Sequence, residues 1–428
     1  MILQNLKVPE QQVSFLQAVR LGLGEQQGLF FPAQWPQLDF EVLLPMPFAL
    51  RSAHILQALI GDEIDALELQ NMVQEAFVFP APLLAVSESC ACLELFHGPT
   101  LAFKDFGARF MARALHVAQK QQQLSRTTIV TATSGDTGAA VAQAFYQQAN
   151  VDVMILFPFG KISPLQEKLF TTLGGNIHTL AVNGDFDACQ SLVKQVFDDR
   201  ELVQQLNINS ANSINISRIF AQVCYYVEAF AQLSDEQQKN AVFAIPSGNF
   251  GNLTAGLIAK VIGLPIKRFI GATNCNDTVP RFLHEHVWKP HQTQATLSNA
   301  MDVSNPNNWP RIQHLLDVGL IAENVLTAVA VSEQETIDSV QQLDGLGYLS
   351  EPHAAVAFHA LQMSLQPSEF GVFLGTAHPA KFQESVETIL GRAIDVPEVL
   401  LEASRKPSLN GLIDADYASL KAKLLALL

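Results

Sequence analysis

Charged residues and cysteines are scarce in this sequence. Of its 428 residues, 16% are charged and 48% hydrophobic, which is typical of a compact globular protein with a large core and two or three domains. The five cysteines are scattered, and the Cys90-x-Cys92 pair has no second pair that would complete a zinc site. We therefore expect reduced thiols, no bound metal and a cytoplasmic location.

Several familiar signals are also missing. The N-terminus, MILQNLKVPEQQ, lacks the basic-then-apolar pattern of a secretion signal, and no apolar run reaches the length of a membrane span. Neither the GxxxxGK(S/T) motif of nucleotide triphosphatases nor the HExxH motif of zinc proteases occurs. The net charge of -15 opposes binding to nucleic acid or to an anionic membrane. It does not exclude a small anionic substrate, because a few local donors decide that.

The hydrophobic pattern divides the chain into three regions. Residues 1–95 predict a helix-rich N-terminal domain, with helices over Gln11–Val19, Ala53–Leu59 and Leu67–Phe77. From about residue 125, short β-branched runs alternate with helical runs, which indicates parallel sheets with right-handed crossovers. We expect an α/β protein with two open, mostly parallel sheet domains flanked by helices, a smaller one over 96–235 and a larger one over 236–428 that ends in helices. Residues 274–310, rich in Asn and Pro, are expected to form a long ordered loop over a functional face.

Lys104 lies in an apolar run at the predicted start of a helix. The stretch Leu95–Gly107 reads LFHGPTLAFKDFG, and a helical pattern follows over Phe106–Val117. Burial and a helix N-terminus both disfavour the ammonium form, and a neutral amine can form a Schiff base. For a lone lysine, a partly buried side chain paired with Asp105 is the commoner arrangement.

Three loops of small residues follow predicted strands, at Ser134–Gly138, Ser247–Gly251 and Gly375–Pro379. Small residues let the backbone approach a ligand, and free N–H groups at a helix N-terminus bind anions. Each loop alone is equally consistent with a simple N-cap turn. Because open parallel sheets bind ligands beyond the carboxyl ends of their strands, three such loops at the same edge of a sheet favour a binding site. With a Schiff-base lysine, the site suggests pyridoxal phosphate.

A fourth element, Asn212–Arg218, offers amide and hydroxyl donors and then an arginine at the start of a long predicted helix. These residues suit helix capping with a solvated arginine. They equally suit a second anion site, because Arg with Asn and Ser donors forms charge-assisted bonds to phosphate. Both interpretations stay open on the residues alone.

Together these motifs resemble those of one enzyme family. HGPTLAFKDFG, TSGDTGAA, NSANSINISR, PSGNFG and FLGTAHPAKF, in this order and spacing, are similar to the threonine synthases, specifically the longer bacterial and fungal type. The similarity runs from GLFFP to near residue 392. It implies the pyridoxal-phosphate fold type II that also includes the tryptophan synthase β subunit. It further implies the conversion of O-phospho-L-homoserine and water to L-threonine and phosphate by γ-elimination and β-hydration, the last step of threonine biosynthesis.

The resemblance also implies roles for particular residues. Lys104 matches the lysine joined to the cofactor, Asp136 the side chain that reaches the phenolic oxygen, and Thr376 the hydroxyl that faces the pyridine nitrogen. The loop for the cofactor phosphate matches Gly248, Asn249, Phe250 and Gly251. The substrate-phosphate site matches Thr137, Asn212, Ser213 and Arg218, while Ser134 and Gly135 border the substrate carboxylate.

Two alternatives stay open at this point: a pyridoxal-phosphate-dependent serine/threonine dehydratase, and a non-catalytic homologue that binds phosphoamino acids. Arg218 argues against the dehydratase, whose substrate carries no phosphate, and Lys104 argues against the non-catalytic homologue. We expect His97, His353 and His378 to be satisfied structural histidines, with His97 and His378 as candidates for a supporting role. The assembly is expected to be a monomer or a dimer.

Overall fold

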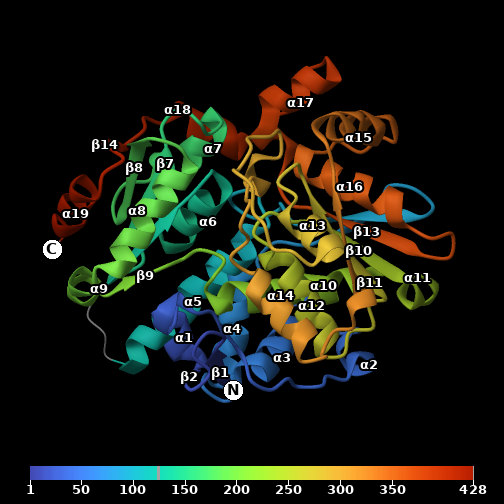
Figure 1. Ribbon diagram of the computed structural model, residues 1–428, viewed down its shortest axis with the longest axis horizontal. Helices are drawn as coiled ribbons and strands as arrows, with labels where there is room; N and C mark the ends of the chain where they lie inside the picture. Colours follow the sequence, from blue (N-terminus) through green and yellow to red (C-terminus); the bar gives the residue numbers. More distant parts are fainter. Residues whose placement is uncertain (123–125, 428) are drawn as a thin grey trace.

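The computed structural model describes residues 1–122 and 126–427, which form two large sheets, one small sheet and the helices that cover them (Figure 1). The five-stranded sheet lies on the left of Figure 1, the six-stranded sheet on the right and the N-terminal segment below. Both large sheets are mostly parallel. The predicted fold class, α/β with two open sheets and an extra N-terminal unit, is confirmed.

The five-stranded sheet is entirely parallel, in the order β14-β8-β7-β6-β9. Its strands are β6 (Thr127–Ala132), β7 (Val151–Pro158), β8 (Ile177–Asn183), β9 (Ile208–Asn209) and β14 (Gly411–Asp414). Every residue of β6 and β7 is buried, as expected for parallel strands covered on both faces. The helices of this region are α6 (Asp136–Phe145), α7 (Pro164–Thr171), α8 (Phe186–Asp198), α9 (Arg200–Leu206), α18 (Glu398–Arg405) and α19 (Tyr417–Leu425).

The six-stranded sheet has the order β12-β11-β10-β13-β5-β4. Among the described pairings of this sheet, only that of β4 with β5 is antiparallel. Its strands are β4 (Leu83–Ala85), β5 (Cys90–Glu94), β10 (Ala241–Pro246), β11 (Arg268–Thr273), β12 (Leu326–Ala330) and β13 (Phe370–Gly375). The helices around it are α5 (Lys104–Gln122), α10 (Ile216–Gln232), α11 (Asp235–Lys239), α12 (Gly251–Val261), α13 (Thr278–Glu285), α14 (Trp309–Asp317), α15 (Glu333–Gly345), α16 (Pro352–Ser364) and α17 (Gln383–Leu390). The α16 helix packs against the three central strands β10, β11 and β13.

The N-terminal unit combines helices with a small antiparallel sheet that the sequence pattern did not predict. Its strands are β1 (Ile2–Asn5), β2 (Gln12–Ser14) and β3 (Phe30–Pro32), and its helices are α1 (Phe15–Leu21), α2 (Phe40–Leu43), α3 (Phe48–Ile60) and α4 (Ala66–Ala76). The predicted helix start at Gln11 is wrong, because Gln12–Ser14 pair with β1. Ser14 then caps α1 in a reciprocal capping box with Gln17.

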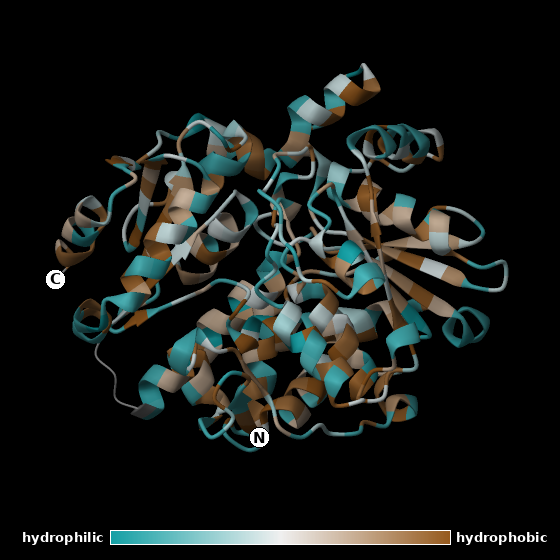
Figure 2. Cartoon of the chain, in the orientation of Figure 1, coloured by the Kyte–Doolittle hydropathy of each residue, from teal (hydrophilic) through white to brown (hydrophobic). Residues whose placement is uncertain are grey.

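An aromatic cluster joins the N-terminal unit to the helices beneath the site. The ring of Phe106 on α5 lies 4.7 Å from that of Phe79 and 5.3 Å from that of Phe77, measured between centroids. Phe48 of α3 and Tyr225 of α10 complete the contacts around this buried ring. Figure 2 shows hydrophobic residues concentrated in the strands and in the helices that pack against them, with hydrophilic residues toward the outside. The helix that begins at Lys104 is therefore fixed on several sides.

Three strands lie outside the sequence region from which their sheet was expected. Residues 83–94 supply β4 and β5 to the six-stranded sheet, and β14, near the C-terminus, pairs with β8 of the five-stranded sheet. The expected C-terminal helices are thus interrupted by a strand. The boundaries at 95/96 and 235/236 stay predictions. Any division into domains has to assign residues 83–94 to the six-stranded sheet and residues 411–414 to the five-stranded sheet.

The Asn- and Pro-rich segment 274–310 is not a single loop, since it contains α13 and a short 3-10 turn at Asn299–Met301. Several of its residues between Ala300 and Pro310 nevertheless line a cavity that also contacts both large sheets' loops. In the described ranges no helix has both the length and the apolar character needed to cross a membrane.

Candidate active site

A cavity of about 470 Å³ lies where loops from both large sheets meet. Every predicted site residue except Gly135 lines it: Lys104, Ser134, Asp136, Thr137, Asn212, Ser213, Arg218, Gly248, Asn249, Phe250, Gly251 and Thr376. The fold thus gathers residues spread over more than half of the chain into one cavity.

The loops that form this cavity come from two sheets and not, as expected, from one sheet edge. The Ser134 loop follows β6 of the five-stranded sheet, whereas the Ser247 and Gly375 loops follow β10 and β13 of the six-stranded sheet. Gly135 has a φ of 137° and lies behind the wall, where an added Cβ would come within 3.0 Å of the Gln166 side chain. Glycine is therefore needed there for conformation and space.

Lys104 is the first residue of α5 and follows a tightly bonded turn. The buried Asp105 carboxylate accepts hydrogen bonds from the Thr100 amide (2.9 Å) and the Thr100 hydroxyl (2.6 Å), so it does not serve as the partner of Lys104. Gly98 packs against it, since a Cβ there would lie 2.4 Å from Asp105 Oδ2. Burial lowers the pKa of the Lys104 amine to about 8, aided by the charges of Arg218 and Lys381 and opposed by Asp136. A neutral, nucleophilic amine is therefore accessible near neutral pH.

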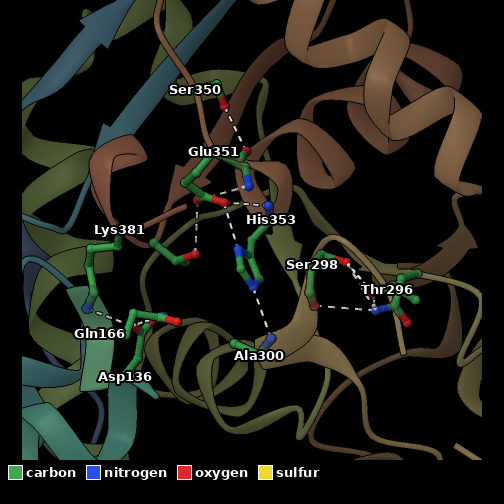
Figure 3. A network of polar contacts seen from close by, with 12 residues as sticks. Asp136, Gln166, Thr296, Ser298, Ala300, Ser350, Glu351, His353 and Lys381 are labelled. Atoms are coloured by element: carbon green, nitrogen blue, oxygen red, sulfur yellow. Dashed lines mark hydrogen bonds and ion pairs between the residues drawn. The ribbon is translucent and has the colours of Figure 1, made fainter. Parts of the chain in front are cut away.

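Asp136, at the start of α6, is held from two sides (Figure 3). Its Oδ1 lies 2.6 Å from Lys381 Nζ and accepts a hydrogen bond of 3.0 Å from Gln166 Nε2. Burial alone would raise the pKa of this carboxyl, but Lys381 and Lys104 lower it to about 2. Asp136 is therefore an anion at the cavity wall. Lys381 belongs to the motif FLGTAHPAKF, yet the predicted site did not include it.

The loop after β10 leaves the N-terminus of α12 open to a ligand. Phe250 at the N-cap has a left-handed φ of 58°, and among the described residues no side chain caps this helix end. Gly248 lies so close to the segment at 301 that a Cβ would be 2.6 Å from Met301 Cα. Free N–H groups at a helix N-terminus suit a phosphate. With Lys104 in the same cavity, these residues fit pyridoxal phosphate.

A second group of donors surrounds Arg218. Its guanidinium is buried, with Nη1 donating to the Ala211 carbonyl, while Nε has no partner within the described residues. Burial lowers the pKa of Arg218 to about 10. The Ser213 hydroxyl accepts hydrogen bonds from Asn249 Nδ2 (2.9 Å) and Asn308 Nδ2 (3.3 Å), which leaves its own proton free to donate into the cavity. Asn212 accepts from Thr131 through Oδ1, so its amide nitrogen is the group available to a ligand.

Arg311 supports this donor group from behind, and only the Asn- and Pro-rich stretch before it marks this arginine in the sequence. Its buried guanidinium donates to Asn308 Oδ1 (2.7 Å), to the Ile214 carbonyl (2.7 Å) and to the Phe30 carbonyl (2.9 Å). Asn308 in turn donates to Ser213 and to the Asn249 carbonyl. One side chain thereby ties the N-terminal unit to the loops that carry Ser213 and Asn249.

Thr376 lies directly after β13 and has a carboxylate behind it. Its hydroxyl donates to Glu351 Oε1 at 3.4 Å, and Glu351 also accepts from the ring nitrogen Nδ1 of His353 at 2.8 Å. His353 Nε2 accepts a hydrogen bond from the Ala300 amide (Figure 3). His353 lines the cavity. Glu351 is not among the predicted site residues, and its contact with Thr376 is seen only in the structure. Its position before Pro352 indicates no more than the N-cap of α16.

The two other histidines do not line the cavity. His97 pairs with Glu94 at 2.7 Å, and His378 Nδ1 accepts from the Ala380 amide at 3.1 Å as the cap of a short 3-10 turn. Burial lowers the pKa of His378 to about 4, so it is neutral under ordinary conditions. Both are satisfied by local partners.

The cavity is positively charged although the whole chain carries a charge of -15. Its charged lining in the described chain consists of the cations Lys7, Lys104, Lys194 and Arg218 and one anion, Asp136. Lys7 comes from the N-terminal unit and Lys194 from α8. Both are exposed, whereas Lys104 is half-buried and Arg218 is buried. A local positive field in an acidic protein favours an anionic ligand.

Comparison with known families agrees with this chemistry. Residues 80–371 match the family model described as pyridoxal-phosphate dependent enzyme. Fold and site together thus define a pyridoxal-phosphate-dependent enzyme of the α/β type.

More specific matches flank that region. Residues 7–77 match the model of the threonine synthase N terminus, and residues 354–422 match that of the threonine synthase C-terminal region. A threonine synthase of Serratia marcescens is 58% identical over the full length of both chains. The crystal structure of threonine synthase from Escherichia coli covers all of both chains with a TM-score of 0.96 and 58% identity. A pyridoxal-phosphate-bound threonine synthase structure from Brucella melitensis has a TM-score of 0.92 and 31% identity over 99% of this chain and 98% of that one.

The chain belongs to the threonine synthase family. It is a pyridoxal-phosphate-dependent lyase of threonine biosynthesis, as the motifs predicted. These comparisons favour this activity over the dehydratase and over the non-catalytic homologue.

Proposed function

We propose that the substrate is O-phospho-L-homoserine, which the enzyme converts with water to L-threonine and phosphate. One observation carries this proposal: a single cavity holds two separate sets of hydrogen-bond donors, each suited to binding an anion. The first is the uncapped N-terminus of α12, and the second is formed by Arg218, Ser213 and Asn212. A dehydratase substrate would leave the second set, including a buried guanidinium, without a ligand.

We assign the cofactor phosphate to the first set. Gly248, Asn249, Phe250 and Gly251 would hold it through backbone N–H groups, because Gly248 lets the loop approach closely and α12 begins there uncapped. Thr376 and Asp136 lie on the wall of the same cavity and would hold the ring by its nitrogen and its phenolic oxygen. When bound, pyridoxal phosphate takes up the electron pair that proton removal leaves on the substrate carbon.

Lys104 is the residue that moves protons. With a pKa near 8, its amine accepts the proton from the substrate α-carbon at neutral pH and returns it later. Arg218, Ser213 and Asn212 would hold the substrate phosphate, and Thr137, which lines the same cavity, would complete the proposed phosphate site. Ser134 and, behind the wall, Gly135 would border the substrate carboxylate.

The phosphate is also the leaving group, so donors that hold it neutralise the charge that develops as its bond to the γ-carbon breaks. The link between Asn249 and Ser213 couples the two anion sites. Filling one site therefore positions the donors of the other.

Substrate discrimination tests the proposal directly. The enzyme is assayed with O-phospho-L-homoserine, with unphosphorylated L-homoserine and with L-threonine, following threonine, phosphate and 2-oxobutyrate. We expect kcat/KM for the phosphorylated compound to exceed the others by more than about a thousandfold, since a site with buried donors rejects a ligand that cannot pair with them. Comparable turnover of L-threonine to 2-oxobutyrate would overturn it.

Location and assembly are the remaining proposals. The five cysteines are free thiols, and four of them are buried, which supports a reducing, cytoplasmic setting. A monomer or a dimer stays our expectation for the assembly, with a small molecule as the sole ligand class and neither nucleic acid nor membrane as a partner.

A further inference from the structure

Lys381 is a lysine with no exposed side-chain surface. It does not itself line the cavity, but it contacts a residue that does. It lies in the 3-10 turn Pro379–Phe382 that follows β13. Its Nζ lies 2.6 Å from Asp136 Oδ1 and donates to the Thr100 carbonyl at 2.7 Å. Figure 3 shows its side chain directed at Asp136.

These contacts join three parts of the molecule that meet beside the cavity. Asp136 begins α6 on the five-stranded sheet, Thr100 lies in the turn that leads to Lys104, and Lys381 follows a strand of the six-stranded sheet. The Lys381 carbonyl also accepts a hydrogen bond of 2.9 Å from the Ser163 hydroxyl at the N-cap of α7. Lys381 is therefore bonded to both sides of the site at once.

The Asp136 carboxylate needs a lasting partner because it is buried. The charged and titratable groups that face it are Lys104 from α5, Lys381 from the turn after β13 and His353 from α16, while Gln166 from α7 donates as a neutral amide. Lys104 is committed to the cofactor and to proton transfer in the proposed function. Lys381 takes part in neither and makes the direct ion pair. A buried carboxylate without such a partner either protonates or destabilises the fold.

We propose that Lys381 is a positioning residue that fixes the charge and orientation of the Asp136 carboxylate across the gap between the two sheets. It acts on the reaction only through Asp136. This inference rests on the place given to Asp136 in the proposed function.

A double-mutant cycle separates this role from a merely structural ion pair. The variants are Lys381→Met, Asp136→Asn, both together, and Lys381→Arg. Lys260→Met serves as the control, because Lys260 is a partly buried lysine in the last turn of α12, at the end away from the cavity. Its amine donates to the backbone carbonyl of Ile266. All variants are saturated with pyridoxal phosphate, and kcat/KM is measured over a range of pH alongside thermal unfolding.

We expect Lys381→Met and Asp136→Asn each to lower kcat/KM by at least about tenfold, and the double variant to be no worse than Asp136→Asn within about twofold. In Lys381→Met, kcat/KM should begin to fall on the acid side at a pH at least about one unit higher than in the wild type. The reason is that burial raises the pKa of Asp136 once the Lys381 ammonium is gone. Lys381→Arg should recover part of the loss. Thermal unfolding of the double variant should occur at a higher temperature than that of Lys381→Met, since it no longer buries an unpaired carboxylate.

Other results overturn the inference. Losses that multiply in the double variant would mean that Lys381 acts independently of Asp136. A Lys381→Met enzyme with kcat/KM within about twofold of the control would show no positioning role. If Asp136→Asn itself were fully active, the placement of Asp136 in the proposed function would fail, and the inference with it. If Asp136→Asn were impaired and Lys381→Met were not, the inference alone would fail.

Discussion

Replacing Arg218 with Met removes a buried charge whose role can be read from its surroundings. The guanidinium donates to the Ala211 carbonyl, and its Nε has no partner within residues 1–122 and 126–427. None of the ion pairs in those ranges involves Arg218, although Asp105 is near enough to stabilise its charge at a distance. Methionine fills a similar volume without the charge.

In the free enzyme this substitution should have a small effect on stability. The lost hydrogen bond leaves one carbonyl unsatisfied, a cost of about 1–3 kcal/mol. Relief from burying a charge offsets that cost. With substrate bound, the loss is much larger, about 2–5 kcal/mol for removing one member of a buried charged pair. That range corresponds to roughly a 30-fold to several-thousandfold fall in kcat/KM.

The assay is the initial rate of phosphate release from O-phospho-L-homoserine, with thermal unfolding measured in parallel. Arg268→Met is the matched control, because Arg268 begins β11, at the opposite strand end from the cavity, and pairs there with Glu369. The control should keep its kcat/KM and lose some stability. A fall of less than about tenfold for Arg218→Met would remove Arg218 from the substrate-phosphate site.

Three further predictions follow from individual contacts. Gly248→Ala should weaken pyridoxal phosphate binding by at least about tenfold, because its Cβ would meet the Met301 backbone at 2.6 Å; an unchanged dissociation constant in a fluorescence titration would argue against the phosphate loop. The rate at which Lys104 in the cofactor-free protein captures pyridoxal phosphate should rise with pH and level off above a pH of about 8, since the neutral amine reacts; a rise that continued beyond pH 10 would contradict the lowered pKa. Lys194→Gln should raise KM by about threefold at low ionic strength and much less at high salt, with kcat unchanged, because Lys194 lines the exposed part of a positively charged cavity; a salt-independent effect would point to another cause.

Much of the fold and most residues of the candidate site could be predicted because their signals are local. The alternation of strands and helices shows in short β-branched and helical runs from about residue 125, and β6 begins close to that point, at Thr127. The apolar neighbours of Lys104 and the turn before it are enough to predict a buried lysine at the start of a helix. Loops such as Ser247–Gly251 carry small residues next to a helix start, which is visible without any knowledge of the fold.

The parts that could not be predicted depend on contacts between distant segments. Lys381 and Asp136 are 245 positions apart by their numbers, and nothing in either neighbourhood indicates the other. The same holds for Arg311 and the Phe30 carbonyl, and for β14, which joins a sheet whose other strands end before residue 210. The sequence pattern predicts helix for Gln12–Ser14, which form β2, because these residues directly precede a true helix and share its apolar pattern. Strand pairing over long separations overrides such local preferences.

The central claim is that Lys104 joins pyridoxal phosphate in the cavity and that the enzyme makes threonine and phosphate there. The most direct test records the visible absorption of the purified protein with pyridoxal phosphate, adds O-phospho-L-homoserine and measures both products, for the wild type and for Lys104→Ala. We predict a band of the protein-linked cofactor and equal amounts of threonine and phosphate for the wild type, with both the band and the products lost in Lys104→Ala. Products formed at an undiminished rate by Lys104→Ala, or a wild-type band with no threonine, would contradict the account.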